Sequence, residues 1–239
     1  MKPMRWTAGF GIFLCGIMGC IGGAAEEGAL PDPEKPGPFP VGVTTIVFKD
    51  YARLDPVSHA PRSLMTEIWY PATEETRGLP KNRLSDFFLK GRSPELVLAL
   101  MAGFGLNLET ADTTFVNEAV RDARVREGNF PLLLFSHGNS GFRMQNVFWC
   151  EHMASHGYIV MAPDHTGNCV ITFVDGLLVP YIDGDAAREQ AKIDRPKDIS
   201  FLIDRMDAMN KGEDSRFLGK VDMSRSEEHT SELQSHLNL

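Results

Sequence analysis

Near the middle of the chain the sequence reads Phe130-Pro131-Leu132-Leu133-Leu134-Phe135-Ser136-His137-Gly138-Asn139-Ser140-Gly141. The first half is a continuous apolar run, which is typical of a strand buried on both faces, as in a parallel sheet. The second half is polar and contains two glycines, which is typical of a turn. The stretch therefore predicts a buried strand that ends in a tight loop.

Downstream of this loop the apolar pattern predicts alternating helices and strands. Arg143 to His156 is predicted to be a helix that stops at Gly157, because glycine is a common residue just past a helix end. Tyr158 to Ala162 predicts a short buried strand, and Arg195 to Met209 predicts a second helix with one apolar face. This order of elements is typical of a mostly parallel sheet in an α/β protein.

Upstream of the loop, two more strands and a helical insertion are predicted. Val41 to Phe48 is rich in β-branched residues, and Ser63 to Tyr70 alternates and is followed by a proline, so both favour strands. Residues 73–129 have helical patterning over Leu84 to Leu108 and over Thr113 to Val125, interrupted by glycines. We expect this insertion to form a wall or lid over a pocket.

The first 25 residues have the composition of an export signal. A basic start precedes an apolar stretch, Phe10 to Ile21, and Gly23-Ala24-Ala25 offers small residues suited to cleavage. Two alternatives stay open: a membrane anchor, for which the stretch is short and glycine-rich, and a lipoprotein signal that ends at Cys20. Residues 26–40 hold five prolines and predict an extended tether between the signal and the domain.

The C-terminal end of the chain has an unusual sequence. From Arg225 it reads Arg-Ser-Glu-Glu-His-Thr-Ser-Glu-Leu-Gln-Ser-His, which matches one reading frame of a common DNA-sequencing adapter. The alternative is an ordinary polar, helical tail. We expect residues 225–239 to be an artefactual tail and residues 41–224 to be the N-terminal part of a longer domain.

Composition excludes some classes of protein. The 239 residues are 43% hydrophobic and 23% charged, which is typical of a globular chain. The net charge of −8 argues against a nucleic-acid surface, which requires clustered Lys and Arg. Cys15 and Cys20 fall in the signal. Cys150 and Cys169 could pair, but the place of Cys150 in a predicted buried helix favours a free core thiol.

The loop from His137 to Gly141 carries the most informative chemistry. Its glycines let backbone N–H groups approach a ligand closely, and the helix predicted after it favours negative charge at its N-terminus. An oxyanion hole for acyl transfer needs this arrangement. A nucleotide-phosphate loop or a plain turn is the alternative, but the chain has neither G-x-G-x-x-G nor a Walker-type lysine.

The sequence around this loop resembles a known family. Phe135–Arg143 and Glu151–Asn168 resemble the platelet-activating factor acetylhydrolases, which have the α/β-hydrolase fold and are related to dienelactone-hydrolase-like and polyester hydrolases. Gly37–Gly42, Ile68–Ala72 and Arg195–Asp204 fit other parts of the same family. The resemblance implies a mostly parallel α/β sheet and a serine esterase that needs no cofactor and no metal.

The resemblance also implies roles for the loop residues. In that family the residue after His-Gly donates its backbone N–H to the oxyanion, and in this chain that residue is Asn139. His137, Gly138, Ser140 and Gly141 would then form the rest of the oxyanion loop.

The family's nucleophile is missing from the chain. Its G-x-S-x-G motif does not occur, and Gly138-Asn139-Ser140-Gly141 lacks the spacing of a nucleophile elbow. We therefore expect an α/β-hydrolase fold that is truncated before its nucleophile strand, and a chain that is inactive as given because the Ser-Asp-His triad is absent. A Ser–His pair of His137 with Ser136 or Ser140 is a weaker alternative, because adjacent residues rarely meet productively.

Two other groups of polar residues follow predicted elements. Asp164 and His165 come after a strand, where α/β sites gather, and are expected to shape the loop or line the substrate pocket. His152 and His156 lie on one helix face, but neither H-E-x-x-H nor its inverse is present. We interpret them as solvated helix residues rather than metal ligands.

Together these features predict an exported serine esterase that acts on a small-molecule or lipid ester, such as a short-acyl phospholipid. We expect it to be periplasmic or secreted, with membrane association through the signal or a lipid anchor as an alternative. A non-catalytic α/β-hydrolase-like binding protein is the competing hypothesis, because fold alone does not fix function.

Overall fold

The computed structural model describes residues 35–55, 59–89 and 107–230, together with residues 95, 99, 102, 103 and 105. The predicted signal peptide, the lipoprotein signal to Cys20, residues 26–34 of the tether and residues 231–239 of the tail lie outside these residues. So does most of the predicted helix between Leu89 and Asn107. In the described part of the chain, no helix combines the length and the apolar character needed to cross a bilayer.

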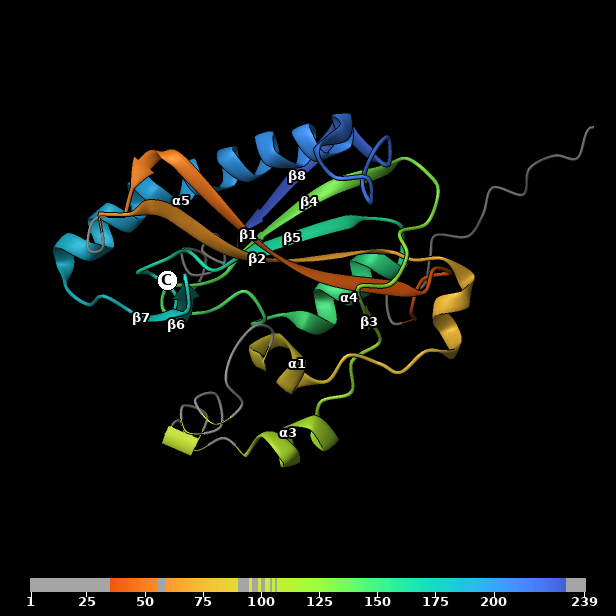
Figure 1. The fold of residues 1–239 in the computed structure, drawn as a ribbon, viewed down its shortest axis with the longest axis horizontal. Coiled ribbons are helices and arrows are strands. Elements are labelled where there is room, and N and C mark those ends of the chain that lie inside the picture. The colour runs from red at the N-terminus through yellow and green to blue at the C-terminus, as the bar shows by residue number, and fades with distance from the viewer. Residues whose placement is uncertain are drawn as a thin grey trace, which may run out of the picture. The chain divides into compact units, whose positions relative to one another are not determined.

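Six strands form one sheet in the order β3-β1-β2-β5-β4-β8 (Figure 1). Three of its five pairings are parallel, including those of β4 with β5 and with β8, whereas β2 is antiparallel to both neighbours. The mostly parallel α/β sheet that the sequence predicts is confirmed. The strands are β1 (Val41–Leu54), β2 (Pro61–Pro71), β3 (Val120–Arg121), β4 (Phe130–Ser136), β5 (Ile159–Pro163) and β8 (Val221–Thr230).

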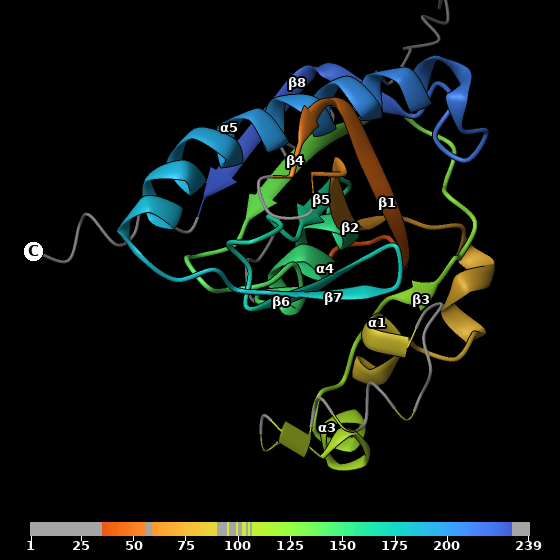
Figure 2. The ribbon, with the colours of Figure 1, turned by 60° about the vertical axis from the view of Figure 1, so that its left-hand side comes forward.

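Strand β4 is buried on both faces, as its apolar run indicates. Leu132 and Leu134 belong to the core beneath helix α5 (Asp185–Ala208), whereas Leu133 and Phe135 belong to the core beneath helix α4 (Val147–Ser155). Figure 2 shows α5 on one side of the sheet and α4 on the other. Because alternate residues of a strand point to opposite faces, only a continuous apolar run can fill both cores.

Both helices differ in their start from the sequence prediction. Helix α4 begins at Val147 rather than Arg143, because the buried Arg143 side chain and its backbone N–H anchor the preceding turn to Asp164. Helix α5 begins at Asp185, ten residues before the predicted Arg195, and continues through Pro196. Residues 185–194 are mostly polar and exposed, so they lack the apolar face on which the sequence prediction rested.

The described residues of the insertion between β2 and β4 form short helices. These are η1 (Glu74–Gly78), α1 (Leu84–Leu89) and α3 (Leu108–Thr114). The helix predicted over Thr113 to Val125 is wrong beyond Thr114, where α3 ends, and Val120–Arg121 instead form strand β3 beside Gly42 and Val43 of β1. Pairing with an existing sheet edge therefore overrides the local helical pattern here.

Tyr70 of β2 ties the end of the insertion to the core. Its hydroxyl donates a 2.8 Å hydrogen bond to the carbonyl of Ala123, and its ring meets that of Phe217 edge-on, with centroids 5.6 Å apart. Gly42 lies against the same ring, where a Cβ would come within 2.2 Å of Tyr70. This close approach requires glycine at position 42.

Two further features were not expected from the sequence. Strands β6 (Ile171–Val174) and β7 (Leu177–Pro180) form a separate antiparallel hairpin after β5. Strand β8 pairs with β4 as far as Thr230, so residues 225–230 are extended rather than helical. Its register shifts between Pro131 and Leu133, which face Asp222 and Glu227 respectively.

Candidate active site

The predicted oxyanion loop follows β4. Three of its backbone N–H groups donate hydrogen bonds within the protein. The N–H of Gly138 donates to Gln145 Oε1 at 3.1 Å, that of Ser140 to the carbonyl of Asn168 at 3.0 Å, and that of Gly141 to the carbonyl of Gly138 at 2.9 Å. The backbone N–H of Asn139 has no acceptor among the residues that the structure describes, and Asn139 is exposed. This N–H is thus available to a ligand.

The conformation of the loop restricts which residues it accepts. Ser140 has a φ of +53°, a left-handed conformation that is uncommon for a residue other than glycine. A Cβ on Gly141 would lie 2.3 Å from Gln145 Oε1, the atom that accepts from Gly138. The side chain of Asn139 is fixed in turn, because Asn168 Nδ2 donates to Asn139 Oδ1 at 2.8 Å.

Behind this loop, Ser136, His165 and Asp198 form a hydrogen-bonded chain. Ser136 Oγ lies 2.8 Å from His165 Nε2, and His165 Nδ1 lies 2.9 Å from Asp198 Oδ2. Burial lowers the pKa of His165 despite the hydrogen bond to Asp198, so the imidazole is neutral near pH 7. Its Nδ1–H then donates to Asp198 and its Nε2 accepts from the Ser136 hydroxyl.

Asp198 is held in its ionised form. Burial alone would raise the pKa of its carboxyl group, but hydrogen bonds from Arg62 and His165 outweigh it and keep the pKa well below the usual range. Arg62 Nε and Nη2 each donate to one carboxylate oxygen at 2.7 Å. A bidentate pair of this kind fixes geometry as well as charge.

The Ser136–His165–Asp198 chain has the connectivity of a catalytic triad but is closed to solvent. Ser136 is 2% exposed, and His165 and Asp198 are 0% exposed. Arg195 Nη2 donates to Ser136 Oγ at 2.8 Å and also to the carbonyl of His137. A buried hydroxyl that already has two partners is poorly placed to attack an ester, so we assign the chain to shaping the loop.

His137 does not reach either serine of the weaker alternative. Its Nδ1 lies 2.7 Å from the carbonyl of Gly138, and its Nε2 accepts from the backbone N–H of His165 at 3.1 Å. Burial holds the pKa of His137 well below its usual value. The partner of Ser136 is therefore His165, a residue 29 positions away that the sequence did not connect to it.

Asp164 and His165 lie within polar networks rather than facing a cavity. Both are fully buried. Asp164 accepts from Arg143 Nη1 at 2.6 Å and from Thr172 Oγ1 at 2.8 Å, and Arg143 Nε also pairs with Glu67. Of the two roles predicted for Asp164 and His165, this geometry corresponds to shaping the loop.

Comparison with known proteins places this geometry in a family. The model of the family described as platelet-activating factor acetylhydrolase, isoform II, matches residues 25–176, more than half of the chain. The chain belongs to this family. The resemblance inferred from the His137–Gly141 loop is confirmed.

A solved structure supports the same fold for this family member. The ferulic acid esterase from Streptomyces cinnamoneus is similar at a TM-score of 0.61 and 25% identity, over 83% of this chain and 54% of that one. The fold is thus that of an α/β-hydrolase. The chain spans about half the length of the esterase that it matches.

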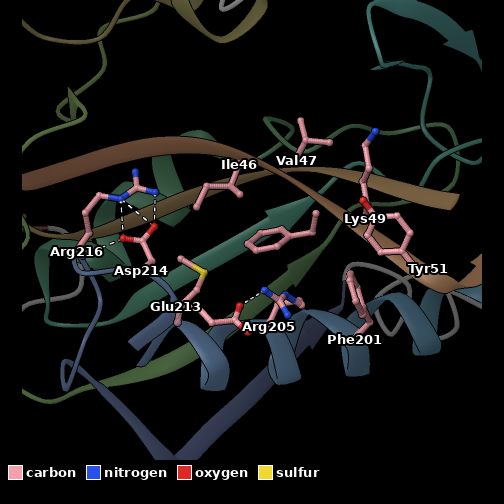
Figure 3. Close-up of a pocket in the computed structure, with 11 residues that line it drawn as sticks. Ile46, Val47, Lys49, Tyr51, Phe201, Arg205, Glu213, Asp214 and Arg216 are labelled. Carbon is pink, nitrogen blue, oxygen red and sulfur yellow. Dashed lines mark hydrogen bonds and ion pairs between the residues drawn. The ribbon is translucent and has the colours of Figure 1, made fainter. Parts of the chain in front are cut away.

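Two cavities lie on the α5 side of this acetylhydrolase-family chain. One, of 230 Å³, adjoins the oxyanion loop through Asn168. The other, of 590 Å³, lies between β1 and the C-terminal half of α5. Figure 3 shows its apolar floor and, at its rim, the ion pairs Arg205–Glu213 and Arg216–Asp214. No residue of the His137–Gly141 loop lines either cavity, but the smaller one is lined by Asn168, whose side chain donates to Asn139, so the smaller one is the candidate for substrate.

The remaining candidates are two cysteines and two helix histidines. Cys150 and Cys169 are both buried and free, as expected for Cys150. The rings of His152 and His156 lie 4.6 Å apart, and both are half-buried rather than fully solvated. Within the described residues no cluster of three or more His, Cys, Asp or Glu has metal-site geometry.

Proposed function

We propose that this chain carries the oxyanion-binding part of an exported serine esterase that hydrolyses carboxylic esters. One observation supports this most directly: the exposed backbone N–H of Asn139 is unoccupied, while its neighbours Gly138, Ser140 and Gly141 are hydrogen-bonded within the protein. A fixed N–H donor aimed at solvent beside a parallel strand end is what a tetrahedral oxyanion requires.

In the proposed reaction a serine attacks the ester carbonyl, and negative charge develops on the carbonyl oxygen. The N–H of Asn139 would donate a hydrogen bond to that oxygen without rearranging, because Asn168 and Arg195 already fix the loop. The chain contains no G-x-S-x-G, so we propose that the chain as given lacks esterase activity.

Substrate and location are proposed on weaker grounds. The family name refers to release of an acetyl group from a phospholipid, which supports a small-molecule or lipid ester with a short acyl group. The basic and apolar composition of residues 1–25 supports export, to the periplasm or outside the cell, or anchoring through Cys20.

The test is to sequence the genomic locus beyond Ser224 and to express both this chain and the complete reading frame. We expect a G-x-S-x-G motif within about ten codons of Ser224. We also expect p-nitrophenyl acetate hydrolysis by the complete protein only, abolished by a fluorophosphonate. A complete sheet without the motif and without hydrolysis would favour the non-catalytic binding protein.

A further inference from the structure

A cavity of 230 Å³ lies between the first turns of α5 and the segment that follows β5. Its wall on the helix side contains three alanines, Ala186, Ala187 and Ala191, together with Gln190 and Asp194, and Arg62 and Arg195 also line it. Both arginines are almost completely buried, at 3% and 6% exposure. The cavity is therefore a slot with small apolar side chains on one wall and two guanidinium groups beside it.

The size of the slot depends on small residues. Gly167 lines it with a φ of +83°, and a Cβ there would lie 3.1 Å from Ile182 Cδ1. Apolar protein cavities of about 150 Å³ hold one benzene molecule. The slot is thus large enough for one six-membered ring with a substituent, and smaller than the pockets of about 300–1,000 Å³ that hold drug-sized ligands.

The hydrogen-bonding edges of both arginines are directed at the protein. Arg62 donates from Nε and Nη2 to Asp198 and from Nη1 to the carbonyl of Thr166. Arg195 donates to Ser136, to the carbonyl of His137 and, at 3.4 Å, to Asn168 Oδ1. An anion entering the slot would compete with these acceptors for the same N–H groups.

The charge around the slot is also balanced. Arg62 pairs with Asp198, which also pairs with Arg53, and the carboxylate of Asp194 lines the slot one residue before Arg195. What guanidinium groups offer when their edges are occupied is a flat, weakly hydrated face, which stacks on aromatic rings. Charge and geometry therefore both favour a neutral aromatic ring over a phosphate or carboxylate.

A single side chain, that of Asn168, connects the slot to the residue of the proposed oxyanion donor. Asn168 lines it, and the same Asn168 side chain donates to Asn139 Oδ1 at 2.8 Å. A ring in the slot would thus lie close to an ester carbonyl bound at the Asn139 N–H.

We propose that this slot binds the aromatic ring of an aryl-containing ester, and so selects such esters as substrates. The inference rests on the proposed esterase function for its link to catalysis, but ring binding itself is independent of the nucleophile. The chain as given is therefore sufficient to test it.

The test is titration of the isotope-labelled chain with benzyl alcohol, followed by amide chemical shifts. We expect shifts at Gly167, Ile182 and Ala191, and binding at least tenfold weaker for cyclohexylmethanol, which has a similar size but no π face. Inorganic phosphate is expected to leave these amides unchanged. Equal binding of the saturated alcohol, or competition by phosphate, would overturn the proposal.

Variants locate the ring in the slot. Ala191→Leu and, separately, Ala187→Leu fill the space and are expected to weaken benzyl alcohol binding at least tenfold. Ser200→Leu, on an exposed part of the same helix, is the matched control and should bind as the parent does. Circular dichroism identifies a variant that fails to fold, and unchanged binding by either folded slot variant would contradict the proposal.

Kinetics of the complete protein separate this proposal from the proposed function. If it hydrolyses phenylacetate esters with a kcat/KM at least tenfold above cyclohexylacetate esters, and Ala191→Leu removes that preference, both proposals hold. Hydrolysis without a preference for phenylacetate esters would contradict only the proposal that the slot binds an aromatic ring. Ring binding in a protein that hydrolyses neither ester would sink only the esterase function.

Discussion

We propose that Asn139 acts in this loop through its backbone N–H rather than through its side chain. Replacing it by proline removes the N–H, whereas Asn139→Ala keeps it and serves as the control. In the complete enzyme we expect Asn139→Pro to lower kcat by about 10²–10³, the usual effect of losing one oxyanion donor. Steady-state kinetics with p-nitrophenyl acetate measure this. If the alanine variant is as slow as the proline variant, the side chain of Asn139 rather than its N–H is required, which contradicts the prediction.

Glu151 links α4 to the end of the insertion and makes the stability of the fold depend on pH. Its carboxylate accepts from the backbone N–H groups of Glu118 and Ala119, yet burial raises its pKa from 4.5 to about 7. The folded state thus binds this proton more tightly than the unfolded chain. The resulting stability is complete below about pH 4.5 and is lost as the pH rises through 7.

We therefore expect Glu151→Gln to remove part of the decline in unfolding free energy between pH 4.5 and 7.5. This pKa shift corresponds to a contribution on the order of 3 kcal/mol to the free energy of unfolding. Urea denaturation at the two pH values measures it, with Glu109→Gln, at an exposed position of α3, as the control. An identical decline in the parent and in Glu151→Gln would show that Glu151 is not the source.

At the scale of residues, the sequence predicted what is local. The glycines and the strand before them predicted a tight loop at His137–Gly141, and the family resemblance implied that Asn139 is its oxyanion donor. The partners that fix the loop were not predictable, because Ser136 and Arg195 are 59 positions apart and Arg62 and Asp198 are 136 apart. Such contacts depend on how helix α5 crosses the sheet, which no local pattern records.

Helix α5 has a proline, Pro196, in its interior. Proline in a helix interior has no N–H for the carbonyl four residues earlier and is about 3 kcal/mol less favourable than alanine. Part of that is offset because proline restricts the unfolded chain. We expect Pro196→Ala to stabilise the domain by about 2 kcal/mol, measured by urea denaturation.

The control for this prediction is Lys197→Ala, at the adjacent exposed position, which leaves the backbone hydrogen bonds of the helix intact. A loss of stability in Pro196→Ala would mean that the proline is needed where it stands, for example to seat Arg195. Strand β4 was predicted almost to the residue, since its apolar run leaves no competing structure. Strand β3 was missed because its two residues pair only through a distant edge.

At the scale of the whole molecule, one sheet serves two cores. Residues of β4 alternate between the core beneath α5 and the core beneath α4, so this one strand contributes side chains to both cores. The sequence predicted this layered architecture from the order of its elements. It did not predict the β6–β7 hairpin, although Ile171–Val174 and Leu177–Pro180 flank an Asp175-Gly176 pair that is typical of a two-residue hairpin turn. The extension of β8 to Thr230 was not predicted because residues 225–230 are polar and have no strand pattern.

The position of Tyr70 between these layers gives the molecule an optical probe of its own unfolding. Burial raises the pKa of Tyr70 far above that of an ordinary tyrosine, whereas Tyr51 is 78% exposed. An alkaline titration followed by near-ultraviolet absorbance detects the ionisation of tyrosine phenols. Tyr70 should stay protonated until the domain opens, and its absorbance step should vanish in Tyr70→Phe. A smooth single titration of all tyrosines in the folded chain would mean that water already reaches this ring.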